Sequence, residues 1–290
     1  MMLELIIYIF FLSIVGIAII FQFFNYILQR IFDLPHIPND KQPEDFNLNA
    51  SNILIPLPHH KKIQLWDLNP KNPAPIILGV HGWANSASRL LYLGSALTSN
   101  WRVFLLNTRN HGESSDEKYI TLLQYSEDLI TAIDYITTEL NCSQKICLLG
   151  HSLGGAAALY TATIDNRVKG VISISTFADL EKMITTGFLR KRMPTSIASS
   201  MIKYIEFRVG KRLRHLSPLY TVGKFTGPVL LLHGTKDKTI PFAELNQIMK
   251  SAKRPNVFKS AISGQTHSSI MDVPDTVLEI EKFLKKYFAD

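Results

Sequence analysis

Short apolar runs alternate with helical patterns along the chain from about residue 51 to its end. The runs are rich in β-branched residues and are bounded by polar or turn-forming ones, which is typical of strands. We expect strands at residues 53–56, 63–68, 75–80, 102–106, 145–149, 168–174, 228–232 and 257–261. The first two lie close enough in the chain to pair as a hairpin.

Helical patterns lie between these strands. Within residues 126–140, Leu129, Ile133, Ile136 and Leu140 fall on one face of a helix. Further helices are expected at residues 153–163, 242–251 and 274–288. This alternation predicts an α/β fold, with a mostly parallel eight-stranded sheet flanked by helices.

The N-terminal part of the chain has a different pattern. Residues 5–28 carry no charge, and about two dozen apolar residues are long enough to cross a hydrocarbon core of roughly 30 Å. A buried core helix is seldom apolar all round over this length. A cleaved signal peptide needs a basic start and a small-residue cleavage site, whereas only Glu4 precedes this run and bulky residues fill its end. We therefore expect a transmembrane anchor.

The residues that flank the anchor indicate its orientation. No Lys or Arg precedes the span, whereas Arg30 and Lys41 follow it, which favours a cytoplasmic domain behind a single-pass anchor. Prolines 35, 38 and 43 favour an extended linker after the span. The expected division is an anchor at 1–30, a linker at 31–50, a main domain at 51–290 and a cap insertion within it at 180–226.

Composition is compatible with this organisation. An apolar content of 46% is ample for a packed core. The two cysteines, Cys142 and Cys147, lie five residues apart and the second falls in a strand-like run. We therefore interpret them as free thiols and expect no metal site.

One strand-to-helix joint carries a chemical motif. The expected strand at 145–149 ends in Gly150-His151-Ser152-Leu153-Gly154, and an alanine-rich helix follows. A serine between glycines at such a joint is typical of a nucleophile elbow, where a strained turn exposes the hydroxyl and the helix N-terminus favours developing negative charge. Ser152 is thus the expected nucleophile, with Gly150 and Gly154 giving room for close packing. The alternative is a tight turn without chemistry.

A serine nucleophile needs a histidine base and an acid that orients it. Asp237 follows the expected strand at 228–232, and His267 lies in the loop after residues 257–261. Loops at the carboxyl ends of parallel strands meet at one edge of the sheet. We expect Asp237 and His267 to complete the triad, with Asp179 as the second choice of acid.

The oxyanion of such a reaction needs hydrogen-bond donors. The expected strand at 75–80 runs into His81-Gly82-Trp83, so the backbone N–H groups of Trp83 and Leu153 are the expected donors. Gly82 would allow the close approach. We expect His81 to have a structural role rather than that of a second base.

At these residues the chain resembles the α/β-hydrolase superfamily. The segments HGW, GHSLGG and HGTKDKTIP and the late histidine are similar to those of its serine-aminopeptidase and monoacylglycerol-lipase-like branch, and the resemblance covers some four fifths of the chain. The family's Asp-x-Arg-Gly-x-Gly-x-Ser-like segment matches residues 107–114, where Asn107 and Asn110 replace the usual Asp and Gly. The resemblance implies hydrolysis through an acyl-enzyme without a cofactor.

The insertion between residues 174 and 228 falls where this superfamily carries a cap over its active site. Residues 181–226 hold ten Lys or Arg and two Glu, a net charge of +8 in a chain whose total is +7. After Pro194, apolar residues recur on one helical face at Ile197, Met201, Tyr204 and Ile205. One reading is a solvated helix whose apolar face closes over the core. The other is a basic cap that lies on anionic phospholipid.

These features predict a membrane-anchored serine hydrolase for carboxylic esters of lipid-like alcohols. Thioester or peptide and amide hydrolysis on the same triad is the first alternative. A non-catalytic binding protein with this fold is an alternative of another class, although no triad member is missing. The expected partners are a small-molecule ester or lipid and the membrane, and no motif for reading nucleic acid is present.

Overall fold

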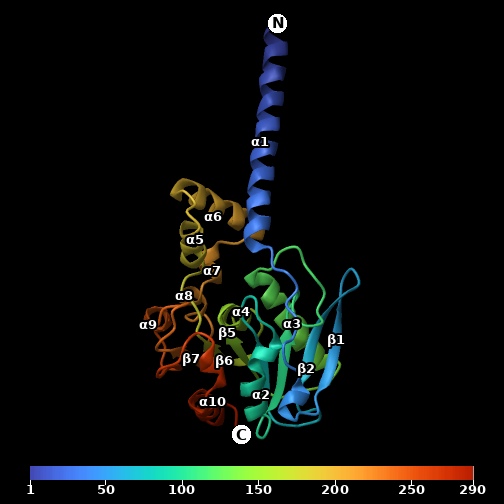
Figure 1. The fold of residues 1–290 in the computed structure, drawn as a ribbon, viewed down its shortest axis with the longest axis vertical. Coiled ribbons are helices and arrows are strands. Elements are labelled where there is room, and N and C mark those ends of the chain that lie inside the picture. The colour runs from blue at the N-terminus through green and yellow to red at the C-terminus, as the bar shows by residue number, and fades with distance from the viewer. Residues whose placement is uncertain (290) are drawn as a thin grey trace.

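An eight-stranded sheet forms the centre of the computed structural model, which describes residues 1–289 (Figure 1). The strands lie in the order β1-β2-β4-β3-β5-β6-β7-β8. Their bounds are Ser51–Leu57 (β1), Lys61–Asp67 (β2), Ile76–Val80 (β3), Arg102–Asn107 (β4), Ile146–His151 (β5), Val168–Ile174 (β6), Val229–Gly234 (β7) and Val257–Ile262 (β8). The β1–β2 and β2–β4 pairs are antiparallel and the other five pairs are parallel. The predicted fold class is therefore confirmed.

The burial of the strands explains their sequence pattern. Every residue of β3, β4, β5 and β7 is buried. Helices cover both faces of the sheet, so these strands read as continuous apolar runs rather than as alternating ones. The edge strand β1 keeps only Ile55 buried.

Five helices cover the two faces. They are α2 (Leu91–Leu97), α3 (Leu122–Thr138), α4 (Leu153–Ala162), α9 (Ala243–Ala252) and α10 (Pro274–Tyr287). The apolar residues of α3, α4 and α9 join one core cluster, and those of α2 and α10 join another. The helix expected at 126–140 begins four residues earlier because Thr121 and Gln124 form a capping box that satisfies its first N–H groups.

Four helices separate β6 from β7. They are α5 (Leu180–Arg190), α6 (Thr195–Val209), α7 (Leu213–Leu216) and α8 (Pro218–Thr221). The apolar face expected after Pro194 is present on α6, but it faces inward: Met201, Ile202 and Ile205 are buried in the main core cluster. The apolar face of α6 therefore closes over the core.

The first helix, α1 (Met2–Phe32), extends away from the sheet past the α5–α6 pair (Figure 1). It is the one helix in the described residues that is long and apolar enough to cross a membrane, with a mean hydropathy of 2.7 over an 18-residue window within Met2–Arg30. None of its membrane-length window is buried. A signal sequence near an N-terminus has the same apolar character.

The segment after α1, expected as an extended linker, is packed against the sheet domain. Ile37 forms a parallel bridge with His111, and its N–H donates to the Asn110 carbonyl at 2.8 Å. Leu34 is buried. The short 3₁₀ helix Pro43–Phe46 follows. The prolines prevent a regular helix, as expected, but polar contacts fix the chain in place.

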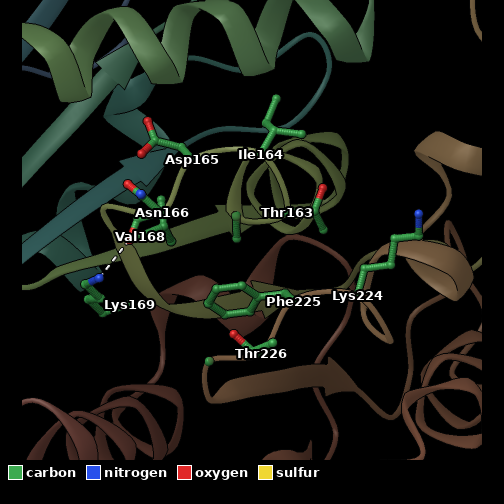
Figure 2. Close-up of a pocket in the computed structure, with 11 residues that line it drawn as sticks. Thr163, Ile164, Asp165, Asn166, Val168, Lys169, Lys224, Phe225 and Thr226 are labelled. Atoms are coloured by element: carbon green, nitrogen blue, oxygen red, sulfur yellow. Dashed lines mark hydrogen bonds between the residues drawn. The ribbon is translucent and has the colours of Figure 1, made fainter.

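A cavity of about 480 Å³ lies at the end of α4, the start of β6 and the turn before β7 (Figure 2). Thr163, Lys169 and Phe225 are among the residues that line it. This edge holds the amino ends of parallel strands, whereas Ser152 precedes α4 at the carboxyl edge. The cavity is therefore separate from the expected active site.

Candidate active site

Ser152 stands between β5 and α4 in a strained backbone conformation. Its φ is 54° and its ψ is −117°, a region that non-glycine residues rarely occupy. Two hydrogen bonds hold the turn: the Ser152 N–H donates to the Ile174 carbonyl at 2.8 Å, and the Thr176 hydroxyl donates to the Ser152 carbonyl at 3.2 Å. The expected strand, turn and helix around this serine are therefore present.

Glycines allow this turn to pack closely on its surroundings. A Cβ on Gly150 would lie 2.3 Å from the Gly154 carbonyl oxygen, and one on Gly154 would lie 2.4 Å from that of His81. A Cβ on Gly82 would lie 3.0 Å from the Ser152 Cβ. The loop after β3 thus passes directly over the serine, as an oxyanion loop must.

Asp237 and His267 lie together, as the sequence predicts. The Nδ1 atom of His267 is 2.8 Å from the Asp237 Oδ2 atom. The other carboxylate oxygen of Asp237 accepts the backbone N–H groups of Thr239 and Ile240 at 2.9 and 2.8 Å. Burial acts to raise the pKa of Asp237, but hydrogen bonds from His233 and His267 outweigh it and hold that pKa below its ordinary value. The acid is thus ionised and fixed in position.

A hydrogen bond from His151 links the loop that carries His267 to the turn at Ser152. The His151 Nε2–H donates to the His267 carbonyl at 2.9 Å, and the two rings lie 4.6 Å apart. Within residues 1–289 no hydrogen bond joins the Ser152 hydroxyl to the His267 ring. Such bonds are often long without substrate and shorten in the complex.

His151 is suited to position His267. Burial lowers the pKa of His151 to about 3, so the ring is neutral and keeps one N–H, which the His267 carbonyl accepts. We expect His151→Phe to lower kcat roughly 10–100-fold with little change in KM, because small displacements of a catalytic group are costly. His151→Gln, which restores a donor, should recover most of the rate. Equal kcat values for the two variants would contradict a positioning role.

Hydrogen bonds to the Gly82 carbonyl hold the loop after β3 in place. The His81 Nδ1–H donates to the Gly82 carbonyl at 2.8 Å, and the Tyr125 hydroxyl donates to the same oxygen at 3.2 Å. No cis peptide bond occurs in the described residues, so the N–H of Trp83 points opposite to that carbonyl. This orientation suits it as an oxyanion donor. Leu153 begins α4, so its N–H has no partner within the helix.

His81 has the environment of a structural residue. It is completely buried, and its Nε2 atom accepts the Thr108 N–H at 3.3 Å. Burial lowers the pKa of His81 well below its ordinary value. Tyr125, which also donates to the Gly82 carbonyl, is not among the site residues that the sequence predicts. Its position four residues before Leu129, on the apolar face of α3, is the signal that places it in the interior.

Three buried histidines make the fold sensitive to acid. Burial lowers the pKa of His111 to about 4 and that of His151 to about 3, and it also depresses the pKa of His81. Unfolded histidines take up protons near pH 6.5. Below that pH the unfolded state binds more protons, so the free energy of unfolding falls by about 1.4 kcal/mol per pH unit for each such histidine until its folded pKa is reached.

We expect His111→Asn to remove one of the groups that take up a proton when the protein unfolds below pH 6.5. The asparagine amide can replace the N–H that His111 donates to the Arg109 carbonyl. The free energy of unfolding, measured by denaturant titration from pH 7 to pH 5, should then fall less steeply than in the wild type. The difference in slope should be that of one histidine, which is at most about 1.4 kcal/mol per pH unit. An identical pH slope in both proteins would contradict the assignment.

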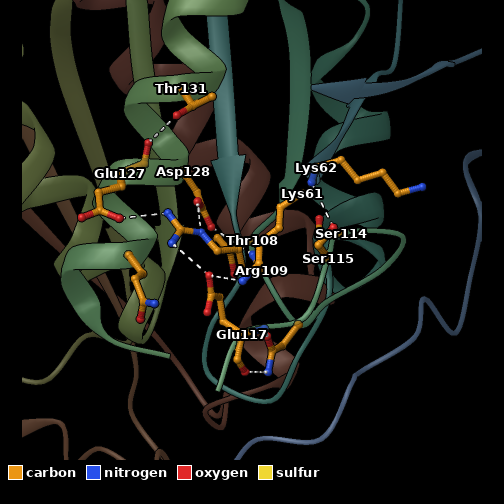
Figure 3. A network of polar contacts seen from close by, with 12 residues as sticks. Lys61, Lys62, Thr108, Arg109, Ser114, Ser115, Glu117, Glu127, Asp128 and Thr131 are labelled. Atoms are coloured by element: carbon orange, nitrogen blue, oxygen red, sulfur yellow. Dashed lines mark hydrogen bonds and ion pairs between the residues drawn. The ribbon is translucent and has the colours of Figure 1, made fainter. Parts of the chain in front are cut away.

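The segment 107–114 explains both departures from the family pattern. Asn110 has a φ of 67°, a left-handed conformation that asparagine tolerates better than most residues, so it can stand where glycine is usual. The Asn107 side-chain oxygen accepts the Ala87 N–H at 2.7 Å, as an aspartate would. Arg109 between them pairs with Asp128 at 2.8 Å and with Glu127 at 2.9 Å (Figure 3). These contacts give the segment a structural role, in which it holds the neighbouring loops in place.

The remaining sequence-based residues have structural surroundings. Asp179, the second choice of acid, caps α5 by accepting the Lys182 N–H at 3.1 Å. Cys142 and Cys147 are free and buried. Among residues 1–289 no group of three or more His, Cys, Asp or Glu side chains is placed to hold a metal ion.

The chain is similar to known hydrolases. A family model described as the alpha/beta hydrolase fold matches residues 75–194. Protein bem46 of Schizosaccharomyces pombe is 30% identical over 217 residues, which cover 70% of this chain and 66% of that protein. The chain belongs to the α/β-hydrolase superfamily.

Solved structures resemble this α/β hydrolase in fold. The Pyrococcus furiosus esterase Pf2001 has a TM-score of 0.69 at 18% identity, over 88% of this chain and 99% of its own. A membrane phospholipase A, described as a bacterial virulence factor, has a TM-score of 0.64 at 15% identity over 99% of both chains. At these identities the likeness is one of fold. Together with the family match, it supports a hydrolase.

Proposed function

We propose that this α/β hydrolase is a membrane-anchored serine hydrolase of carboxylic esters. The observation that carries the proposal is the pairing of the Asp237 carboxylate with the His267 ring, on a loop that His151 ties to the strained elbow at Ser152. A buried, ionised acid on a histidine whose loop is tied to a partly buried serine is the arrangement of an activated nucleophile.

The proposed reaction has two halves. Ser152 Oγ attacks the acyl carbon while His267 Nε2 takes its proton, and Asp237 holds the imidazole by its Nδ1–H. The N–H groups of Trp83 and Leu153 stabilise the oxyanion. The His267 proton then passes to the leaving alcohol, and an acyl-enzyme remains. Water, deprotonated by His267, attacks this ester, and the acid leaves as Ser152 regains its proton.

Lipid-like esters are the proposed substrate class. The anchor helix α1 passes beside the cap, and its Phe32 ring lies 6.4 Å from the ring of Trp83, next to the proposed oxyanion donor. The proposed active site would therefore lie close to the anchor helix. The fold likeness to a membrane phospholipase A over nearly the whole chain is consistent with this class. Arg30 and Lys41, which follow the span, favour a catalytic domain on the cytoplasmic side.

Labelling with a fluorophosphonate probe tests this proposal directly. The probe reacts with an activated serine, so the full-length protein in detergent should be labelled at one site, which peptide mass spectrometry should map to Ser152. Heat-denatured protein should not react. A folded protein that is unlabelled, or labelled elsewhere, would overturn the proposed nucleophile.

The substrate class needs a second measurement. Among p-nitrophenyl esters from acetate to palmitate, we expect the highest kcat/KM at medium or long acyl chains. Matched thioester and amide substrates should be cleaved more slowly. An optimum at acetate, or faster amide cleavage, would contradict the lipid-ester assignment while leaving the serine mechanism in place.

A further inference from the structure

The outward side of the cap carries a basic surface that the proposed catalysis does not use. We call it the cap surface; it consists of Leu189, Arg190, Lys191, Arg192, Lys203, Phe207 and Arg208. All of these residues are exposed, and Phe207 is 74% exposed although it is a large apolar residue. The core occupies the inward face of α6, so Lys203, Phe207 and Arg208 are exposed on α6, while the other four residues lie at the end of α5 and in the turn before α6.

The charge of the cap surface lacks internal compensation. Within residues 1–289 no acidic side chain forms an ion pair with Arg190, Lys191, Arg192 or Lys203. Of the two acids in the insertion, Glu206 already accepts the Leu213 N–H and pairs with Arg212. An anionic partner would offset the mutual repulsion of the three consecutive exposed cations at the α5–α6 turn.

Contacts between α6 and the anchor helix α1 fix the position of the cap surface along the axis of α1. The Tyr204 ring of α6 lies 5.6 Å from that of Phe21 and 5.3 Å from that of Phe24, and its hydroxyl donates to the Asn25 side chain at 2.7 Å. Arg208 also donates to Asn25. The α6 helix therefore lies across α1 beside its C-terminal third (Figure 1).

Helix geometry relates this contact to the bilayer. The seventeen uncharged residues from Leu5 to Phe21 span about 25 Å at about 1.5 Å per residue, which is near the short end of the lengths that cross a hydrocarbon core. Phe21, whose ring contacts Tyr204 of α6, thus lies near the level where the hydrocarbon would end and the headgroups begin. Polar contacts at Asn25 fit that depth.

We propose that the cap surface binds the headgroups of anionic phospholipids, with Phe207 inserted at the acyl boundary. An exposed aromatic residue on a helix with basic side chains, as Phe207 is with Lys203 and Arg208 on α6, is typical of helices that lie in a membrane interface. The cytoplasmic leaflet, on which the proposed orientation places the domain, is the negatively charged one. This inference rests on the proposed anchoring of α1, and it is independent of the proposed chemistry.

Three variants of the full-length protein, each with one added cysteine, test the inference in lipid nanodiscs. Because both native cysteines are buried, an environment-sensitive dye can be attached selectively at Phe207→Cys, at Gly16→Cys in the anchor or at Leu278→Cys on α10. A Cβ at Gly16 meets no atom within 4 Å, and Leu278 is 53% exposed. The dye at 278 reports water, and the dye at 16 reports whether α1 is inserted.

The expected result is specific to lipid charge. In nanodiscs with about a third phosphatidylglycerol, the dye at 207 should shift to the blue and be quenched by headgroup-level nitroxide lipids, whereas the dye at 278 should not. Neutral phosphatidylcholine or about 1 M salt, where the Debye length is about 3 Å, should weaken both effects at 207.

A charge-matched pair of variants separates local binding from net charge. The triple variant R190Q/K191Q/R192Q should weaken the response at 207, because each basic residue near an anionic surface changes the docking equilibrium about fivefold. The triple variant K282Q/K285Q/K286Q on α10 removes the same charge far from α6 (Figure 1) and should leave the response unchanged.

The outcomes distinguish this inference from the proposed function. An inserted dye at 16 with a water-exposed dye at 207 would overturn the inference and leave the anchor. Equal responses at 207 in neutral and anionic lipid would overturn the assignment to anionic headgroups. A water-exposed dye at 16 would overturn the anchor and the inference with it, while fluorophosphonate labelling would still report on the hydrolase.

Discussion

Replacing Ser152 with alanine should lower kcat for a p-nitrophenyl ester by about 10⁶-fold, to a residual rate set by the oxyanion donors and by substrate binding. The expectation follows from the proposed acyl-enzyme, which cannot form without the Ser152 hydroxyl. The backbone around the residue should tolerate the change, because the hydrogen bonds that hold the turn use the Ser152 N–H and carbonyl and not its hydroxyl.

Ser175 provides a matched control. It follows β6, the neighbour of β5 in the sheet, has a φ of 50° and is fully buried. Its hydroxyl makes no hydrogen bond in the described residues. Ser175→Ala should therefore keep kcat within a few-fold of wild type. Steady-state kinetics on both variants, with thermal unfolding to confirm that each is folded, gives the comparison. Retention of more than about 1% of the wild-type kcat in Ser152→Ala would show that another group is the nucleophile.

The sheet could be predicted because its strands are buried on both faces. Runs such as 228–232 have no competing helical periodicity, and the observed strands begin or end within a few residues of the predicted ones. The start of α3 was set too late because the prediction followed the apolar stripe from Leu129 onward. The capping pair Thr121 and Gln124 was visible in the sequence, and a search for capping boxes would have found it.

The geometry of the site depended on contacts that no local pattern contains. The elbow motif and the chain order of Ser152, Asp237 and His267 led to side chains that do lie at one edge of the sheet. The tie from His151 to the His267 carbonyl joins residues 116 positions apart in the chain. It could not be predicted from spacing.

The same limit applies to the segment after α1 and to the cap helix. Proline content correctly indicated irregular backbone after residue 32, but the bridge between Ile37 and His111 is a tertiary contact. The apolar face of α6 has the same periodicity whether it meets lipid or protein. Only the packing of Met201 and Ile205 in the core decides between the two.

Asp237→Asn should lower kcat at neutral pH by about 10⁴-fold while leaving the fold in place. The two carboxylate oxygens of Asp237 have different partners. Because Oδ1 accepts the N–H groups of Thr239 and Ile240, the asparagine oxygen must take that position. Its NH₂ group then takes the position of Oδ2, which in the wild type lies 2.8 Å from His267 Nδ1, and faces that nitrogen.

This forced orientation reverses the tautomer of His267. An NH₂ group donates to Nδ1, so the ring proton moves to Nε2, the atom that must accept the proton of Ser152 in the proposed mechanism. The control is Asp179→Asn, because asparagine caps a helix about as well as aspartate and should leave kcat within about twofold. Steady-state kinetics at pH 7 decides between the two acids. A large loss in Asp179→Asn with none in Asp237→Asn would transfer the acid's role to Asp179. Loss only in Asp237→Asn would mean that His267 depends on this carboxylate for its reactive tautomer.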